Sequence, residues 1–361
     1  MARVFRRLAV VAAVLAVGLA AVWFTAGDRL VLALAARMAG ANMAADRAAT
    51  LPDGLHLAVC GAGGPMPDAL RSGPCQLVVA GTFAFMVDAG SMGARNLARM
   101  GFRNGGITAI LLTHFHSDHI DGLGEAMMLR WTAGSNREPV PVYGPPGVEM
   151  VLEGFHQAYA QDAQYRTAHH GPDVMPPGGA GGVPKVFPEP QGDEGVVVFE
   201  RDGVKITAFS VNYAPVHPAV GYRFDYKGRS LVVSGDTGPA PVLDKFAAGA
   251  DLLAHEALAP ALVAALAEAA EGAGRGNLAH VMHDIPDYHT TPAQAAALAA
   301  RAGVKQLVLT HITPPLPSRL LDRVFLDGVA AVYDGPVTIA RDGDLFSLPA
   351  GTTAIVTEHL F

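Results

Sequence analysis

The hydrophobic positions of this chain fall into short apolar runs that are separated by Gly, Pro and Asp residues. Apolar runs of this kind, bounded by turn residues, are typical of buried β-strands. The runs form one series before the region around residue 190 and another series after it. We expect strands at residues 55–59, 76–79, 84–87, 107–112, 196–200, 205–211, 221–226, 231–233, 305–309 and 337–339.

Helical periodicity occupies the gaps between these runs, at residues 123–130, 147–161, 260–271 and 292–302. The last segment has the clearest ends, because Thr291 can cap it, Pro292 suits its first turn and Gly303 can end it. Strands and helices are therefore mixed in two halves, which predicts an α/β sandwich whose sheets are covered by helices. Residues 170–192 are too rich in Gly and Pro for this pattern, so we expect a long loop at the mouth of an active site.

The N-terminus combines a basic start with a long apolar run. Three arginines precede residues 8–24, which contain no charged or strongly polar side chain. This length lies at the lower limit for spanning a bilayer and slightly above a usual signal-peptide core. We expect an uncleaved signal-anchor in the inner membrane and an exported body, periplasmic or on the cell surface, with a cleaved signal peptide as the alternative. The expected divisions are 1–27 (signal-anchor or signal peptide), 28–52 (helical stalk) and 53–361 (globular domain).

The charge of the chain is unevenly distributed. Six arginines and two aspartates give residues 1–50 a net charge of +4, which leaves −11 for residues 51–361 out of a total of −7. An acidic body is a poor electrostatic match for a polyanion such as tRNA or DNA, which argues against nucleic acid as a partner. The chain has two cysteines, Cys60 and Cys75, and the sequence leaves open whether they form a disulfide.

The strongest chemical feature is the run THFHSDH at residues 113–119, directly after the apolar run 107–112. Neutral imidazoles and carboxylates at this spacing are the ligands that Zn²⁺ and similar ions prefer, whereas a surface loop would gain nothing from them. Further polar residues follow later apolar strands, so we expect them at a common rim with the first group. The candidate metal ligands are His114, His116, Asp118, His119, His217, Asp236 and His311.

Together these motifs resemble those of the metallo-β-lactamase superfamily, whose first motif is matched by Asp88 in FMVDAG. The resemblance covers roughly residues 55–315. It implies an αββα four-layer sandwich with two Zn²⁺ ions, for which Mn²⁺ or Fe²⁺ could substitute. In that arrangement one ion is held by His114, His116 and His217, and the other by Asp118, His119 and His311, with Asp236 bridging the two. Asp88 is then expected to orient the site loop without binding metal.

The chemistry implied by this resemblance is hydrolysis. Two bound cations lower the pKa of a water between them, which supplies hydroxide at neutral pH, and they neutralise charge in the transition state. Asp118 can accept the proton of that water. A metal-binding module without catalytic activity is the non-enzyme alternative.

Three shorter stretches resemble the ribonuclease Z group: the Gly-rich opening at residues 57–67, AHEA at 254–257 and HTT at 289–291. In that group the His and Glu of the second stretch assist proton transfer to the leaving oxygen, which implies catalytic roles for His255 and Glu256. Only 18 residues separate His217 from Asp236, so the tRNA-gripping arm of the group is absent here.

The missing arm, the export and the acidic body shift our expectation away from tRNA processing. We expect an arylsulfatase-like hydrolase of small sulfate or phosphate esters, acting on an anionic or aromatic ester that Arg166 could help to bind. A phosphodiesterase or ribonuclease Z-like nuclease, or a lactonase, is the alternative. The sequence leaves a homodimer open.

Overall fold

The computed structural model of the protein describes residues 2–361 and falls into two units, with the division of the chain between Asp46 and Arg47. The first unit is the helix α1 (Ala2–Ala44). Its segment Arg3–Phe24 is apolar and long enough to cross a membrane, a property that a signal sequence shares. The helix continues past residue 27, where we expected the first division of the chain.

Among residues 47–361 the second unit contains two β-sheets. The eight-stranded sheet has the order β15 (Val356–His359), β14 (Asp344–Pro349), β1 (Gly54–Gly61), β2 (Cys75–Ala80), β3 (Phe83–Val87), β4 (Ala109–Leu111), β5 (Val140–Gly144) and β6 (Gly182–Val186). The seven-stranded sheet has the order β13 (Val337–Ile339), β12 (Gln306–Thr313), β11 (Leu252–Leu258), β10 (Arg229–Val233), β9 (Val220–Tyr226), β8 (Val204–Ser210) and β7 (Gly195–Arg201).

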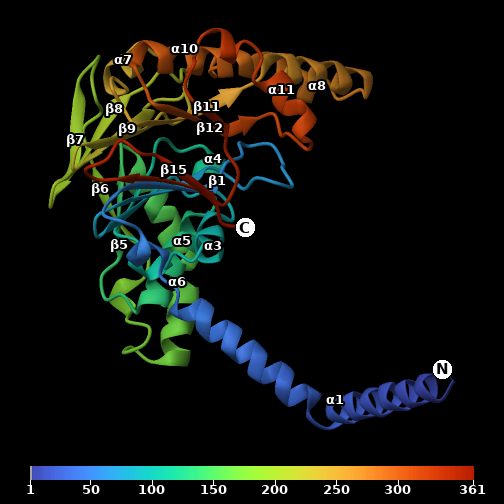
Figure 1. Cartoon of the computed structure of the whole chain (residues 1–361). Coiled ribbons are helices and arrows are strands. Elements are labelled where there is room, and N and C mark those ends of the chain that lie inside the picture. Colours follow the sequence, from blue (N-terminus) through green and yellow to red (C-terminus); the bar gives the residue numbers. More distant parts are fainter. Residues whose placement is uncertain (1) are drawn as a thin grey trace. The chain divides into compact units, whose positions relative to one another are not determined.

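Helices cover the outer face of each sheet (Figure 1). The first sheet is covered by α3 (Gly93–Arg99), α5 (Leu123–Gly134) and α6 (Val148–His170), and the second by α7 (Val242–Phe246) and α10 (Pro292–Ala302). The other α-helices of this unit are α2 (Arg47–Thr50), α4 (Ser117–Ile120), α8 (Pro260–Gly272), α9 (Gly276–Asp284) and α11 (Asp322–Phe325). Short 3₁₀ turns lie at Asn104–Gly106, Pro177–Gly179, Ile285–Asp287, Arg319–Leu321 and Val329–Ala331.

The hydrophobic core is divided by the two sheets into layers. The central layer joins side chains from the inner faces of both sheets, among them Phe85, Phe346, Tyr222 and Phe224. A further apolar cluster lies between the first sheet and its helices, and another lies between the second sheet and its helices. Each sheet is therefore buried on both of its faces, on one by the other sheet and on the other by helices. This order of layers confirms the expected αββα sandwich.

Each expected strand overlaps an observed one, and α10 has the expected bounds, with a capping box between Thr291 and Gln294. Several segments differ from expectation. The strands β5, β14 and β15 and the helices α3 and α9 were not expected, and residues 182–186 of the expected loop form the edge strand β6. The AHEA stretch lies inside the fully buried strand β11, which was not expected either. The polar pair His255 and Glu256 interrupts the apolar pattern of β11, which is why periodicity did not identify this strand.

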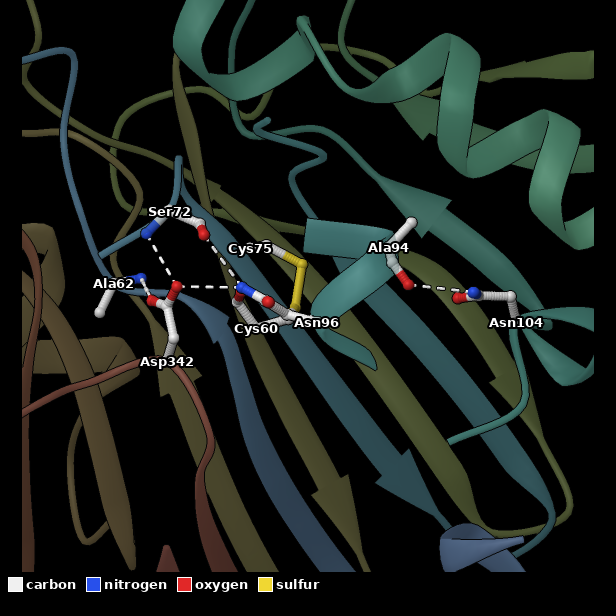
Figure 2. The surroundings of a disulfide bond; sticks show 8 residues. All are labelled: Cys60, Ala62, Ser72, Cys75, Ala94, Asn96, Asn104 and Asp342. Atoms are coloured by element: carbon white, nitrogen blue, oxygen red, sulfur yellow. Dashed lines mark hydrogen bonds between the residues drawn. A yellow bond between two sulfur atoms is a disulfide. The ribbon is translucent and has the colours of Figure 1, made fainter. Parts of the chain in front are cut away.

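The two cysteines form a disulfide between β1 and β2, which answers the question that the sequence left open (Figure 2). The bond closes the loop of residues 61–74. Buried Asp342 anchors the same loop through two hydrogen bonds, which it accepts from Ala62 N (3.0 Å) and Ser72 N (2.8 Å), and ties it to α3 by accepting a third from Asn96 Nδ2 (2.9 Å). The loop is therefore held at its base by both covalent and polar contacts.

Candidate metal centre

The candidate metal ligands gather where strands of the two sheets end. The THFHSDH run follows β4, Asp236 follows β10, and His311 lies near the end of β12. Two hydrogen bonds join the sheets at this edge: Val220 N donates to Thr113 O (3.0 Å), and the Tyr222 hydroxyl donates to Leu112 O (2.6 Å). The loop that carries four of the candidate ligands is thus fixed against both sheets.

Asp118, His119 and His311 form one side of the centre, which we call the Asp118 side. Asp118 Oδ2 lies 3.3 Å from His311 Nε2 and 3.5 Å from His119 Nε2. Neighbouring ligand atoms of a tetrahedral ion with bonds of about 2.0 Å are about 3.3 Å apart. These donor atoms therefore already have the separations that a bound ion requires.

Asp236 connects this side to the rest of the centre. Its Oδ1 lies 3.3 Å from His119 Nε2, and its Oδ2 lies 3.2 Å from His311 Nε2 and 3.9 Å from His114 Nε2. Because its carboxylate approaches ligands from both halves of the THFHSDH run, Asp236 is placed to bridge two ions. Burial raises the pKa of Asp236, but the electrostatic interactions with His311 and His119 outweigh it and hold the pKa well below the usual value, so the carboxylate is ionised.

His114 and His116 form the other side, which we call the His116 side. His114 Nε2 and His116 Nδ1 face each other at 3.1 Å. Burial, together with the neighbouring His119, lowers the pKa of His114 well below its ordinary value. A neutral imidazole has the free lone pair that a metal ion needs.

His119 shows most directly that the donor set fits a metal. Its Nδ1 is held by Asp88 Oδ2 at 2.8 Å, while among the described residues its buried Nε2 faces only other candidate ligands, the carboxylates of Asp236 at 3.3 Å and Asp118 at 3.5 Å. Asp88 also accepts a hydrogen bond from Thr113 N (2.8 Å), so it orients the loop as expected. A carboxylate that fixes the far nitrogen of an imidazole is the usual support of a metal-ligating histidine.

Local backbone geometry aims His311 into the centre. The pairing of β11 with β12 shifts between Glu256 and Ala257, which leaves His311 as the extra residue of a β-bulge with φ 47°. Bulges redirect a side chain next to a functional site. Gly64 of the disulfide-closed loop packs on this ring, since a Cβ there would lie 2.9 Å from His311 Cε1. The loop is thus one wall of the centre.

His217, one of the expected ligands, is not brought to the centre. Its side chain is 71% exposed, and its Nε2 pairs with Glu189 at 2.8 Å. After β8 ends, Val216 N donates to Tyr213 O (2.8 Å), and this turn sends Tyr213 inward and His217 outward. The Tyr213 ring packs edge-on against His114 and His116 instead.

Of the two residues expected to assist proton transfer, only Glu256 faces the centre. Successive side chains of a strand point to opposite faces, and His255 and Glu256 are neighbours in β11. His255 therefore lines a cavity beneath α10 on the outer face of the sheet. Arg166, which was expected to help bind the substrate, forms an ion pair with Asp162 on α6.

His289 takes the place at the centre that we expected for His255. Its Nδ1 lies 3.2 Å from Glu256 Oε1, and its ring stacks on His311 at 5.7 Å. Burial lowers the pKa of His289, but the Glu256 carboxylate raises it to about 9, so the imidazole is protonated at neutral pH. The HTT stretch pointed to this residue, yet only the fold shows that it meets Glu256.

Comparisons with known proteins agree with this geometry. Residues 85–312 match the model of the Beta-lactamase superfamily domain. Ribonuclease Z of Mycobacterium avium (strain 104) is 38% identical over 264 residues, covering 73% of this chain and 87% of that protein. Ribonuclease Z of Mycolicibacterium gilvum (strain PYR-GCK) is 39% identical, covering 73% and 85%.

Two solved structures share the fold. Human tRNase Z, short form, has a TM-score of 0.58 at 20% identity, covering 81% of this chain and 99% of that one. The metallo-β-lactamase fold protein YhfI from Bacillus subtilis has a TM-score of 0.57 at 20% identity, with the same coverage.

The ribonuclease relatives overturn our argument against nucleic acid as a partner, which was wrong. That argument used the net charge of the whole body, whereas binding depends on the charge near the site, where metal ions add positive charge. The fold of these relatives implies a centre of two metal ions, typically zinc, and the candidate ligand groups fit it. By its family match, its relatives and its architecture, the chain belongs to the metallo-β-lactamase superfamily of metal-dependent hydrolases.

Proposed function

We propose that this protein is a metal-dependent phosphodiesterase that cleaves RNA phosphodiesters. The observation that carries the proposal is the buried pair of His289 and Glu256 beside the ligand cluster. Cleavage of a phosphodiester expels an alkoxide, which needs a proton, and this pair supplies a proton donor next to the candidate ligand His311. The ribonuclease Z relatives support RNA as the substrate class.

Each polar group of the pair has a defined task in this proposal. Glu256 Oε1 is held by Thr290 N (2.8 Å) and keeps the imidazolium of His289 charged and oriented. His289 then donates its proton to the leaving oxygen. Asp118, whose pKa is lowered to about 2 by its His311 and His119 contacts despite burial, is ionised and can accept a proton from water. Bound ions would supply Lewis-acid activation of water and neutralise charge on the phosphoryl oxygens.

A cavity beside Asp118 offers arginines to the phosphate groups of a substrate. It has a volume of about 770 Å³, and the disulfide-closed loop forms part of its wall. Arg99, Arg319 and Arg341 line it together with several carboxylates, and the Arg99 guanidinium lies 3.9 Å from the ring centroid of Phe361. Arginines suit phosphate oxygens, and an aromatic ring suits a nucleobase.

The function is tested by comparing the rates of hydrolysis of bis(p-nitrophenyl) phosphate, p-nitrophenyl phosphate, p-nitrophenyl sulfate and a lactone. The same enzyme is then assayed on an RNA with a 3′ extension. We expect bis(p-nitrophenyl) phosphate to be hydrolysed at least about tenfold faster than the monophosphate or the sulfate, a preference of about 1.4 kcal/mol. Cleavage of the RNA by metal-loaded enzyme would extend this to the proposed substrate. Turnover of the sulfate alone would replace the proposal with an arylsulfatase, and turnover of the lactone alone with a lactonase.

We also propose that α1 anchors the enzyme in the inner membrane and that the body is exported. The arginines in the first turns of α1, ahead of its apolar segment, support this orientation, and a disulfide is typical of oxidising compartments. Protease added to spheroplasts should digest the body while sparing a cytoplasmic control protein. Protection of the body until the cells are lysed would contradict export.

A further inference from the structure

The His116 side of the centre contains a phenol where the related enzymes are expected to have an imidazole. Tyr213 is only 4% exposed, and its hydroxyl lies 3.4 Å from His116 Nδ1. Its ring centroid is 5.1 Å from that of His114 and 5.4 Å from that of His289. The phenol therefore lies inside the cluster of candidate ligands, whereas His217 lies outside it.

We propose that the phenolic oxygen of Tyr213 is the third protein ligand of the ion held by His114 and His116. The separations that the structure shows are 3.1 Å between His114 Nε2 and His116 Nδ1, and 3.4 Å between His116 Nδ1 and Tyr213 Oη. Both agree with the distance of about 3.3 Å between neighbouring ligand atoms of a tetrahedral ion. The inference rests on the metal dependence in the proposed function and not on its substrate.

A purely structural role for Tyr213 explains the geometry less well. A ring that only fills space does not need a hydroxyl, and a buried hydroxyl needs polar partners. Here both partners of the hydroxyl are candidate ligands: it lies 3.4 Å from His116 Nδ1, the nitrogen that faces His114, and it is hydrogen-bonded to the carboxylate of Asp236. Burial and nearby Asp236 raise the pKa of the phenol in the metal-free centre, and a bound cation acts in the opposite direction.

An oxygen ligand changes the chemistry of this side. Imidazole suits zinc, copper, iron and nickel, whereas oxygen donors favour harder ions, and tyrosine oxygen is a known ligand of iron. The His116 side should therefore accept iron or manganese more readily than a site built from three imidazoles. The Asp118 side keeps its carboxylate and two imidazoles and needs no such change.

The test is iron loading of the purified full-length protein in detergent, followed by visible absorption and metal analysis. An iron(III) ion bound by Tyr213 should give a phenolate-to-iron charge-transfer band, which Tyr213→Phe and Tyr213→His should both lose. The metal content of Tyr213→Phe should fall from close to two ions per chain to about one. Tyr213→His should keep both ions and should bind zinc in preference to iron. Tyr288→Phe is the matched control, because Tyr288 packs on the Tyr213 ring at 5.9 Å, and this variant should keep the band.

The possible failures are distinguishable. An iron-loaded wild-type protein without the band, or a Tyr213→Phe variant that keeps the band and both ions, overturns the assignment of Tyr213 alone. A wild-type protein that binds no metal overturns the proposed function itself. If Tyr213→Phe does not fold, a folded Tyr213→His variant with both ions and no band supports the ligand role, and persistence of the band in that variant refutes it.

Discussion

The two sides of the metal centre are built from different donors. The Asp118 side combines a carboxylate with two imidazoles, and Asp236 approaches it at 3.2 and 3.3 Å. The His116 side has two imidazoles and a phenol, and Asp236 approaches His114 only at 3.9 Å. A site with more negative charge and closer ligands binds a cation more tightly. The comparison therefore predicts a tight ion on the Asp118 side and a weaker one on the His116 side.

Removal of the shared ligand should have the largest effect on both sides. Asp236→Ala takes away the carboxylate that faces His119, His311 and His114, so both ions should be lost. Turnover should fall by at least about 10³-fold, because the ions supply several kcal/mol of charge stabilisation. Metal analysis and the rate with bis(p-nitrophenyl) phosphate measure the two effects. Asp225→Ala, on β9, is the control. A variant that kept both ions would show that Asp236 is no bridge.

The next prediction concerns proton transfer, which should depend on His289 and not on His255. His289→Asn should lower turnover by about 10²–10⁴-fold, the usual contribution of a general acid, while the metal content stays the same. The loss should be larger for RNA than for a p-nitrophenyl ester, because p-nitrophenolate leaves without a proton.

His255→Asn is the matched variant, one residue from Glu256 but facing the outer cavity of the sheet. It should keep turnover on both substrates near that of the wild type. An equal loss in the two variants, or a loss in His255→Asn alone, would return the proton-transfer role to His255.

The metal centre also shows which of its residues the sequence could predict. The THFHSDH ligands follow one strand within seven residues, so their proximity does not depend on the rest of the fold. Asp236 follows the end of β10 and His311 lies near the end of β12, and the sheet order brings those ends together. The strand and helix pattern predicted an α/β sandwich whose sheets are covered by helices, and the resemblance to the metallo-β-lactamase superfamily implied its αββα order.

The residues that sequence reasoning misplaced depend on local geometry. His217 was expected at the centre, but the turn after β8 brings in Tyr213, four positions earlier. His255 was expected to face the centre together with Glu256. The two residues are neighbours in the strand β11, however, so their side chains point to opposite faces of the sheet. A small change of phase in a strand or turn decides which side chain faces the centre, and no composition or spacing rule decides that phase.

A smaller, one-sided effect is expected from Asp88, which holds His119 Nδ1 at 2.8 Å. Asp88→Asn should weaken metal binding on the Asp118 side by about 10–100-fold, the usual cost of losing such a support. In a chelator titration, this variant should then release its two ions at similar chelator concentrations. In the wild type, the weaker ion of the His116 side should leave at a lower chelator concentration than the other. A wild type that releases both ions in one step would contradict the asymmetry of the two sides.

The smallest effect is expected from His217, although the sequence placed it among the metal ligands. Its exposed side chain contacts Glu189 at 2.8 Å, and an exposed ion pair contributes about 0.2–1 kcal/mol to the free energy of unfolding. His217→Ala should therefore keep both ions and change turnover by less than about twofold. His116→Ala, in the same assays, should lose the ion of the His116 side together with most of the activity. If His217→Ala lost that ion instead, metal binding would have to draw His217 inward and displace Tyr213, so the same pair of variants tests both residues.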